Sequence, residues 1–310
     1  MIRYFIIVIN RFKELILEKL NRNSFLSNST LSIIENSVAS LCGLGVRFSY
    51  NSNENIFFAS EDLKQIKFSN RVRGFSLYRN GIKKRAEFIF NSYCLKNIAF
   101  SEDDVVIDCG ANSGDLMIKL QEFIKPSNYI GIEPNPSDFE ILKLNVSNKS
   151  KLINKGLGNS NQTLPFYVNT EDGDSSIIEP KQYSQICNIP VLRLDNLMQQ
   201  LNLNKVKLIK IEGEGYEPEI IEGLGSSIDK CEYIAIDGGY ERGKNSEQTF
   251  TKVTNHLLNN GFEIIDIYFT SNIVIKALEN KNKIYLKYKK KESLFTLLKK
   301  VKNTKLKFIK

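Results

Sequence analysis

The stretch Val105–Asp115 reads VVIDCGANSGD and decides the fold class. Its apolar run is typical of a buried strand that ends at Asp108, and a helix is expected to begin near Gly114. Gly110 lets the turn between them approach a ligand without a Cβ in the way, and Asn112 tolerates a left-handed backbone. The free N–H groups at the start of that helix suit an anionic group. The stretch therefore predicts a strand, loop and helix that bind a ligand.

An acidic residue stands at the end of the next predicted strand. The segment YIGIEPN places Glu133 25 positions after Asp108. An acid there can accept hydrogen bonds from both ribose hydroxyls of an adenosine. The glycine spacing is Gly-x-x-x-Gly and not the GxGxxG of pyrophosphate binders, which disfavours a nicotinamide dinucleotide. The alternative interpretation is a tight turn capped by an acid, without a ligand.

Short apolar runs alternate with helical patterns from Asp103 onward, which predicts an α/β fold with a mostly parallel sheet covered on both faces. The predicted strands are Val105–Cys109, Tyr129–Ile132, Lys151–Asn154, Leu208–Ile211 and Tyr233–Ile236. The helical patterns include Gly114–Phe123 and Ser137–Val146. Residues 163–194 interrupt the alternation as a small β excursion. Two last runs, Phe262–Phe269 and Asn272–Leu278, are separated by two residues and predict an antiparallel hairpin at the sheet edge.

The positive charge of the 310-residue chain is concentrated at one end. The formal net charge is +8, and Lys281–Lys310 contains twelve lysines and one glutamate, or +11, so the other 280 residues carry 8 − 11 = −3. A nucleic-acid enzyme more often spreads basic residues over its folded body, so no nucleic-acid partner is expected. The apolar residues of this basic tail have roughly helical spacing. It is expected either to lie on anionic lipid or to be a solvated tail.

Several classes of protein are excluded. Five isolated cysteines and a single histidine, His256, exclude a zinc site of the usual spacing, and the low cysteine density favours a reducing compartment. No apolar run approaches the roughly 18 to 20 residues of a membrane span. Met1–Leu20 lacks a signal-peptide cleavage site, and its apolar residues recur at helical spacing. We expect a helix packed on the domain or a partner chain, with an interfacial membrane helix as the alternative.

Five sequence blocks, in this order, resemble the FkbM-type methyltransferases of the class I S-adenosylmethionine-dependent enzymes. They are VVIDCGANSGD, GIEPNPSDFEILKLNV, LRLDNL, LIKIEGEGYEPEIIEGL and YIAIDGGYERGKNSEQTF, and the resemblance covers about residues 71–278. It implies a Rossmann-like fold with a seven-stranded sheet that contains one antiparallel strand. It also implies O-methylation with S-adenosylmethionine, often on natural products or on sugars of glycans and polysaccharides. We therefore expect an N-terminal helical extension over residues 1–100, a methyltransferase domain over 101–280 and a basic C-terminal tail over 281–310.

The resemblance also implies a set of cofactor-binding residues. The methionine end of the cofactor would lie among Asp108, Gly110, Ala111, Asn112 and Gly114. Glu133 would hold the ribose, and Pro134 and Asn135 would line the adenosine. Leu157 and Gly158 would lie beside the adenine.

Candidates for the chemistry follow the fourth and fifth predicted strands. A hydroxyl acceptor profits from a general base, and we expect Glu212 or Asp237 in that role, either as the base or as the group that orients it. Glu214 would contact the cofactor or the substrate, and Lys210 would pair with these acids or touch the substrate. In the family that the chain resembles, an aspartate stands at the position of Glu212. The side chain of Glu212 is one methylene longer than that aspartate. An ion-pair network that merely orders the loop is the alternative, and no spacing demands a metal.

Two other functions remain open at this point: a nucleotide-dependent oxidoreductase, and a non-catalytic, membrane-associated glycan-binding module. The expected partner is a small-molecule or glycan acceptor. Arg242 is a candidate contact for an acidic group on it. The sequence is compatible with an oligomer of this chain. The expected location is cytoplasmic, with attachment to the inner face of the membrane through the basic tail as an extension of that expectation.

Overall fold

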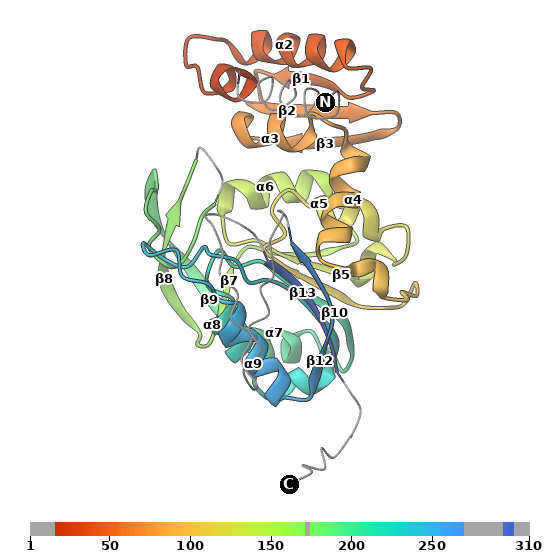
Figure 1. The fold of residues 1–310 in the computed structure, drawn as a ribbon, viewed down its shortest axis with the longest axis vertical. Helices are drawn as coiled ribbons and strands as arrows, with labels where there is room; N and C mark the ends of the chain where they lie inside the picture. Colours follow the sequence, from red (N-terminus) through yellow and green to blue (C-terminus); the bar gives the residue numbers. More distant parts are fainter. Residues whose placement is uncertain (1–15, 171–173, 270–293, 301–310) are drawn as a thin grey trace, which may run out of the picture.

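The structure is a computed structural model that describes residues 16–170, 174–269 and 294–300. Its largest sheet has seven strands in the order β12-β13-β11-β10-β4-β5-β6 (Figure 1). In chain order these are β4 (Val106–Cys109), β5 (Tyr129–Ile132), β6 (Lys151–Ile153), β10 (Val206–Ile211), β11 (Cys231–Asp237), β12 (Phe262–Phe269) and β13 (Leu294–Lys300). Strand β13 is antiparallel to both of its neighbours, whereas the strands from β11 to β6 pair in parallel. The predicted α/β class and the single antiparallel strand are therefore confirmed.

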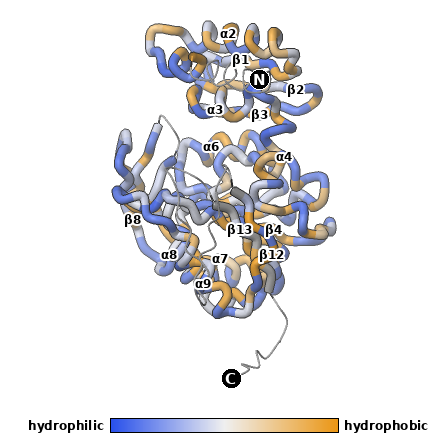
Figure 2. Tube along the Cα trace, in the orientation of Figure 1, coloured by the Kyte–Doolittle hydropathy of each residue, from blue (hydrophilic) through white to orange (hydrophobic). Residues whose placement is uncertain are grey.

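Helices cover both faces of this sheet. Ile107 and Cys109 of β4 face a core made with α7 (Leu194–Gln200), α8 (Glu217–Glu222) and α9 (Phe250–Asn259). Val106 faces the opposite core, which contains residues of α4 (Ile82–Ser92), α5 (Asp115–Leu120) and α6 (Pro136–Asn145). Three short 3₁₀ helices complete the layers: η1 (Leu95–Asn97), η2 (Pro126–Asn128) and η3 (Gly225–Lys230). Figure 2 shows hydrophobic residues along strands of this sheet, for example at β4 and at β12 on its edge.

The partner of β12 differs from the prediction. β12 pairs with β13, which lies in the segment expected to be a basic tail, and the predicted hairpin strand Asn272–Leu278 falls outside the described residues. Thr296 and Leu298 of β13 are both buried, two positions apart, as a strand between two others requires. Residues 294–300 are thus part of the sheet and not of an appended tail.

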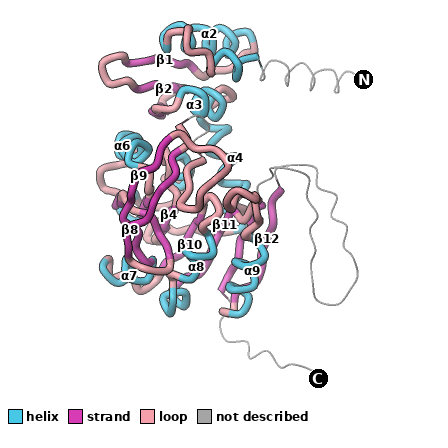
Figure 3. The backbone as a smooth tube through the Cα atoms, turned by 90° about the vertical axis from the view of Figure 1, so that its left-hand side faces the viewer, coloured by secondary structure: helices cyan, strands magenta, loops and turns pink. Residues whose placement is uncertain are grey.

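The first part of the chain is not purely helical, in contrast to the prediction. Helix α2 (Asn28–Leu41) and α3 (Arg71–Tyr78) flank an antiparallel sheet of β1 (Arg47–Asn51), β2 (Ile56–Glu61) and β3 (Lys64–Phe68). We call residues 16–81 the N-terminal module. It has its own core, which includes Phe48, Phe57, Phe68 and Phe75. The module stacks on one end of the sheet domain (Figures 1 and 3).

The predicted N-terminal helix is described only in part. Residues 16–21 are helical and Leu17 is buried, and residues 1–15 lie outside the described ranges. Within the described ranges, no helix combines the length and the apolar character that crossing a bilayer demands.

Two polar anchors fix the N-terminal module to the loop after β4. The side chain of Asn145 accepts from the Lys67 N–H and donates to the Lys67 carbonyl and to the Ser113 carbonyl, with N–O distances of 2.8 to 2.9 Å. Asp115 accepts a hydrogen bond from Tyr78 and pairs with Arg85, whose Nε lies 2.9 Å from Oδ2. The module is therefore tied to residues 113–115, next to the predicted ligand loop.

The predicted β excursion is a separate three-stranded sheet. It has the order β7-β9-β8, with β7 (Gly156–Gly158) parallel and β8 (Gln162–Val168) antiparallel to β9 (Gln185–Arg193). Figure 3 shows β8 and β9 as two long strands beside the large sheet. This sheet forms one wall of the site described next.

Candidate active site

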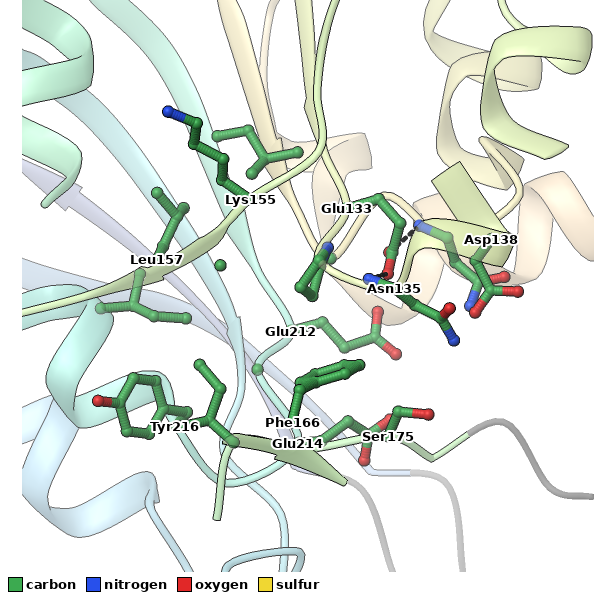
Figure 4. Close-up of a pocket in the computed structure, with 18 of the residues that line it drawn as sticks. Glu133, Asn135, Asp138, Lys155, Leu157, Phe166, Ser175, Glu212, Glu214 and Tyr216 are labelled. Atoms are coloured by element: carbon green, nitrogen blue, oxygen red, sulfur yellow. Dashed lines mark hydrogen bonds between the residues drawn. The ribbon is translucent and has the colours of Figure 1, made fainter. Parts of the chain in front are cut away.

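A cleft of about 680 Å³, counting the part open to solvent, lies at the carboxyl ends of β4, β5 and β10 (Figure 4). Open α/β sheets hold their ligands at these strand ends. Eight of the predicted site residues line this one cleft: Gly110, Asn112, Glu133, Pro134, Asn135, Leu157, Glu212 and Glu214. The structure thus brings together residues that the sequence separates by up to 104 positions.

The other predicted site residues are not among those that line the cleft, and they are buried near it. They are Asp108, Ala111, Gly114, Gly158, Lys210 and Asp237. A Cβ on Gly114 would lie 2.6 Å from Val146, and one on Gly158 would lie 3.0 Å from the ring of Tyr216. These two glycines therefore serve the packing of neighbouring elements.

The carboxylate of Glu133 is fixed by backbone groups from both sides. Its Oε2 accepts the Asn112 N–H and its Oε1 accepts the Asn135 N–H, each at 2.8 Å. Figure 4 shows the side chain reaching into the cleft between these two loops. Burial, reinforced by the charge of Asp138, raises the pKa of Glu133 to about 8 against the opposing effect of these bonds. Each oxygen has a further lone pair for a ribose hydroxyl.

The buried side chain of Lys210 connects the carboxyl ends of β4 and β10 beneath the cleft. Its Nζ lies 3.2 Å from Oδ1 of Asp108 and 2.8 Å from Oε2 of Glu212. It also donates to the Gly110 carbonyl at 2.8 Å. Burial alone would lower the pKa of Lys210, and the two carboxylates raise it instead, so the amine stays charged. The side chain therefore holds the glycine loop to β10.

Glu212 is held in its ionised form. Burial opposes this charge, but Lys210 and the hydrogen bond from Tyr93 at 2.8 Å lower the pKa of Glu212 to about 2. A carboxylate with so low a pKa is a weak proton acceptor at neutral pH. Its position suits an electrostatic role toward a cationic ligand better than a role as a general base.

The pKa of Glu214 is shifted in the opposite direction from that of Glu212. Glu214 lies in the loop after β10 with a left-handed backbone (φ 48°) and lines the cleft. Burial, and then the charges of Asp174 and Glu212, raise its pKa well above the usual range. Glu241, after β11, has a pKa raised in the same way by burial and by Glu214. These two carboxylates share one electrostatic environment.

The loop that carries Glu214 is ordered by buried side chains. Oε1 of Glu217 accepts the N–H groups of Gly213 and Gly215 at 2.8 and 3.1 Å. Arg242 donates to the Gly215 carbonyl and forms a bidentate pair with Glu219. Arg242 is thus engaged in ordering this loop, which differs from the predicted contact with an acceptor. Asp237 accepts the Gly239 N–H at 3.2 Å at the turn after β11.

Sequence reasoning missed several residues of the cleft. They include Arg73, Asp138, Lys155, Phe166 and Tyr216. Asp138 stands inside the quoted block GIEPNPSDFE, in the first turn of α6, and its position could have signalled the site. Arg73 belongs to the N-terminal module and carries no comparable signal.

Comparison with known proteins decides the family. Residues 108–264 match the model of the methyltransferase FkbM domain, which is about half of the chain. The chain belongs to the FkbM methyltransferase family. The FkbM match spans β4 to the start of β12 and therefore includes the glycine loop, Glu133 and the loop of Glu214. This FkbM protein is a methyltransferase that uses S-adenosylmethionine.

Individual relatives agree with this assignment. The chain is 26% identical over 179 residues to Methyltransferase 1 of Beauveria bassiana, covering 48% of this chain and 72% of that protein. It is 21% identical over 187 residues to the 2-O-methyltransferase NoeI of Sinorhizobium fredii, covering 54% and 76%. A precorrin-6y C5,15-methyltransferase structure from Geobacter metallireducens covers 71% of this chain and 88% of its own at 13% identity, with a TM-score of 0.40 that is too low to argue from.

The residues of the cleft fit this cofactor. Glu133 offers an acceptor pair for the ribose, and Leu157 and Pro134 offer apolar surface for the adenine. Glu212 lines the cleft and keeps a low pKa, so it offers negative charge for a cationic group of the cofactor. Among the described residues, no three His, Cys, Asp or Glu side chains are grouped so that they could hold a metal ion.

Cofactor affinity should rise with pH between about pH 6.5 and about pH 8.5, by up to about tenfold per unit. Because the pKa of Glu133 is about 8, its carboxyl carries a proton at lower pH. This proton must leave before the carboxylate can accept hydrogen bonds from two ribose hydroxyls. Calorimetric titration with S-adenosylhomocysteine in buffers of different ionisation enthalpy measures both the affinity and the proton released. Glu133→Gln should bind weakly and show a flat pH profile. A flat profile in the unmodified protein would exclude this linkage.

Proposed function

We propose that this enzyme transfers the methyl group of S-adenosylmethionine to a hydroxyl of a sugar, within a glycan or a polysaccharide precursor. The observation that carries the proposal is the protonatable Glu214 at the lip of the cofactor cleft. Its pKa is raised by burial and by neighbouring carboxylates, so its ionised form is a stronger proton acceptor than an ordinary carboxylate. The similarity to a protein named as a 2-O-methyltransferase supports an oxygen acceptor.

The protein's own residues supply alignment and a proton acceptor. The cofactor supplies an electrophilic methyl group. The acceptor oxygen forms the new O–CH₃ bond as the S–CH₃ bond breaks, and Glu214 takes the hydroxyl proton. Glu212 remains ionised beside Lys210 and stabilises positive charge in the cleft. Lys210 keeps β4 and β10 together so that this geometry is maintained.

Glu214→Gln should lower kcat by about 10²- to 10⁴-fold, because an amide cannot accept the proton. At saturating S-adenosylmethionine, the kcat of the unmodified enzyme should rise with pH and then level off, since a carboxyl with a raised pKa accepts a proton only in its ionised form. The variant should lose this rise. The measurement is transfer of labelled methyl from S-adenosylmethionine to fractionated glycans.

Glu247→Gln is the matched control, because Glu247 is an exposed carboxylate in the segment after β11. It should retain the activity and the pH profile. Full activity of Glu214→Gln would remove Glu214 as the base. Methylation of peptides or lipids with no label in carbohydrate would exclude the proposed acceptor class.

A further inference from the structure

The third residue of α3, Arg73, lines the cofactor cleft although it lies 35 positions before the region that matches the family. It also lines a second cleft of about 860 Å³, again counting open space, between the N-terminal module and the sheet domain. The two clefts share Arg73, Asn112, Asn135 and Asp138. Arg73 therefore stands where the N-terminal module meets the glycine loop.

The position of Arg73 is fixed by its helix. The Asn70 side chain caps α3 and accepts the Arg73 N–H at 3.0 Å. Gly74 follows, and a Cβ there would lie 1.9 Å from the ring of Phe68, so the helix packs directly on β3. Asn145 joins Lys67 of the module to Ser113, and Tyr78 of the module donates to Asp115, so the module is tied to residues 113–115. The guanidinium is thus delivered to the cleft by a rigid element.

The charges of the cleft leave one cofactor group without an obvious counterpart. Its lining includes four carboxylates, Glu133, Asp138, Glu212 and Glu214, and among them Glu212 has a lowered pKa and stays ionised for the sulfonium or the ammonium group. The α-carboxylate needs a cation. Of the cations that line the cleft in the described part of the chain, Lys155 stands next to Leu157, at the predicted adenine end, as Figure 4 shows. Arg73, in contrast, lines the second cleft as well, together with Asn112 and Asp138.

The current surroundings of Arg73 are consistent with such a role. Its Nη1 lies 3.8 Å from Oδ1 of Asp174, at the outer limit of an ion pair, and the Asp174 side chain is 56% exposed. Burial would lower the pKa of Arg73, but Glu214 and Asp174 raise it, so the charge persists. A planar guanidinium can bind a carboxylate through two parallel hydrogen bonds.

We propose that Arg73 of the N-terminal module binds the α-carboxylate of S-adenosylmethionine, so that the cofactor site is completed from outside the family's domain. The contact is a charge-assisted, bidentate hydrogen bond between the Arg73 guanidinium and the amino-acid end of the cofactor. It makes the N-terminal module a functional part of the enzyme.

The test pairs a residue change with a change in the ligand. S-adenosylhomocysteine carries the carboxylate, whereas 5′-methylthioadenosine lacks the whole amino-acid portion. Measured by calorimetry, the affinity of Arg73→Gln for S-adenosylhomocysteine should be about 10- to 100-fold weaker than that of the unmodified protein. Its affinity for 5′-methylthioadenosine should stay within about twofold. Arg73→Lys keeps the positive charge but loses the planar pair of donors. Its affinity for S-adenosylhomocysteine should lie between those of the unmodified protein and Arg73→Gln.

Arg71→Gln is the matched control. Arg71 is on the same helix, bonds to Asn28 and to the Asn23 carbonyl, and is not among the residues that line either cleft. It should bind both ligands normally. Equal losses for both ligands in Arg73→Gln would show a structural role and overturn the proposal. Unchanged affinity for S-adenosylhomocysteine would overturn it too, and a raised acceptor KM alone would then assign Arg73 to the acceptor.

Discussion

Replacing Lys210 with methionine should lower the free energy of unfolding by about 3 to 5 kcal/mol, because it leaves a buried carboxylate without its counter-charge. Asp108 is fully enclosed, and besides Lys210 it contacts the hydroxyl of Tyr129 at 2.7 Å. Glu212 would lose the same partner. Urea denaturation followed by circular dichroism measures the change.

The same strand offers a matched control for this result. Lys207 of β10 also pairs with a glutamate, Glu232, and lies 5.3 Å from the ring of Tyr233, as Lys210 does from Tyr93. It differs in being less buried, so Lys207→Met should cost less than about 1 kcal/mol. Asp108→Asn should rescue part of the loss in Lys210→Met. Equal effects at 207 and 210 would contradict the buried network.

Replacing Gly110 with alanine should raise the Kd for S-adenosylhomocysteine by about 100-fold. The reason is a cost of about 2 to 3 kcal/mol for straining and displacing the backbone of the loop. Gly110 has φ 77°, and its Cβ would lie 2.3 Å from the Glu212 carbonyl oxygen. Neither backbone can move freely, since Gly110 N–H bonds the Ile132 carbonyl and Glu212 N–H bonds the Cys109 carbonyl. The loop must therefore shift away from β10.

Gly45→Ala is the control for the glycine substitution. No atom lies within 4 Å of its Cβ position, and its φ is not in the left-handed range. Calorimetry on both variants should show a loss at Gly110 alone. Affinity within about threefold of the unmodified enzyme in Gly110→Ala would mean that the loop tolerates a side chain.

The core of the site was predictable because its signals are local. Strands β5 and β12 have the predicted bounds, and β4, β10 and β11 differ by one or two residues at an end. A strand buried on both faces is a continuous apolar run, which is visible in the sequence. Gly110 and Glu133 could be placed because each follows such a run at the point where the chain turns.

The rest depended on packing that the sequence does not display. Leu294 and Leu298 are four positions apart, which fits one face of a helix and also one face of a strand, so the pattern could not distinguish them. Arg73 reaches the site only because one module packs on another. Glu212 and Lys210 were named as catalytic candidates from their position after a strand. Their mutual pairing is a product of the fold, and it is this pairing with Lys210, together with the hydrogen bond from Tyr93, that lowers the pKa of Glu212 against the effect of burial.

The place of β13 has a consequence for biosynthesis. The ribosome makes β12 before β13, with 24 residues between them, and among the described strands β12 is joined to the sheet through β13. Until β13 emerges, β11 therefore has an unpaired edge of the kind that recruits other chains. The nascent enzyme therefore needs protection at that edge until β13 has paired with β11.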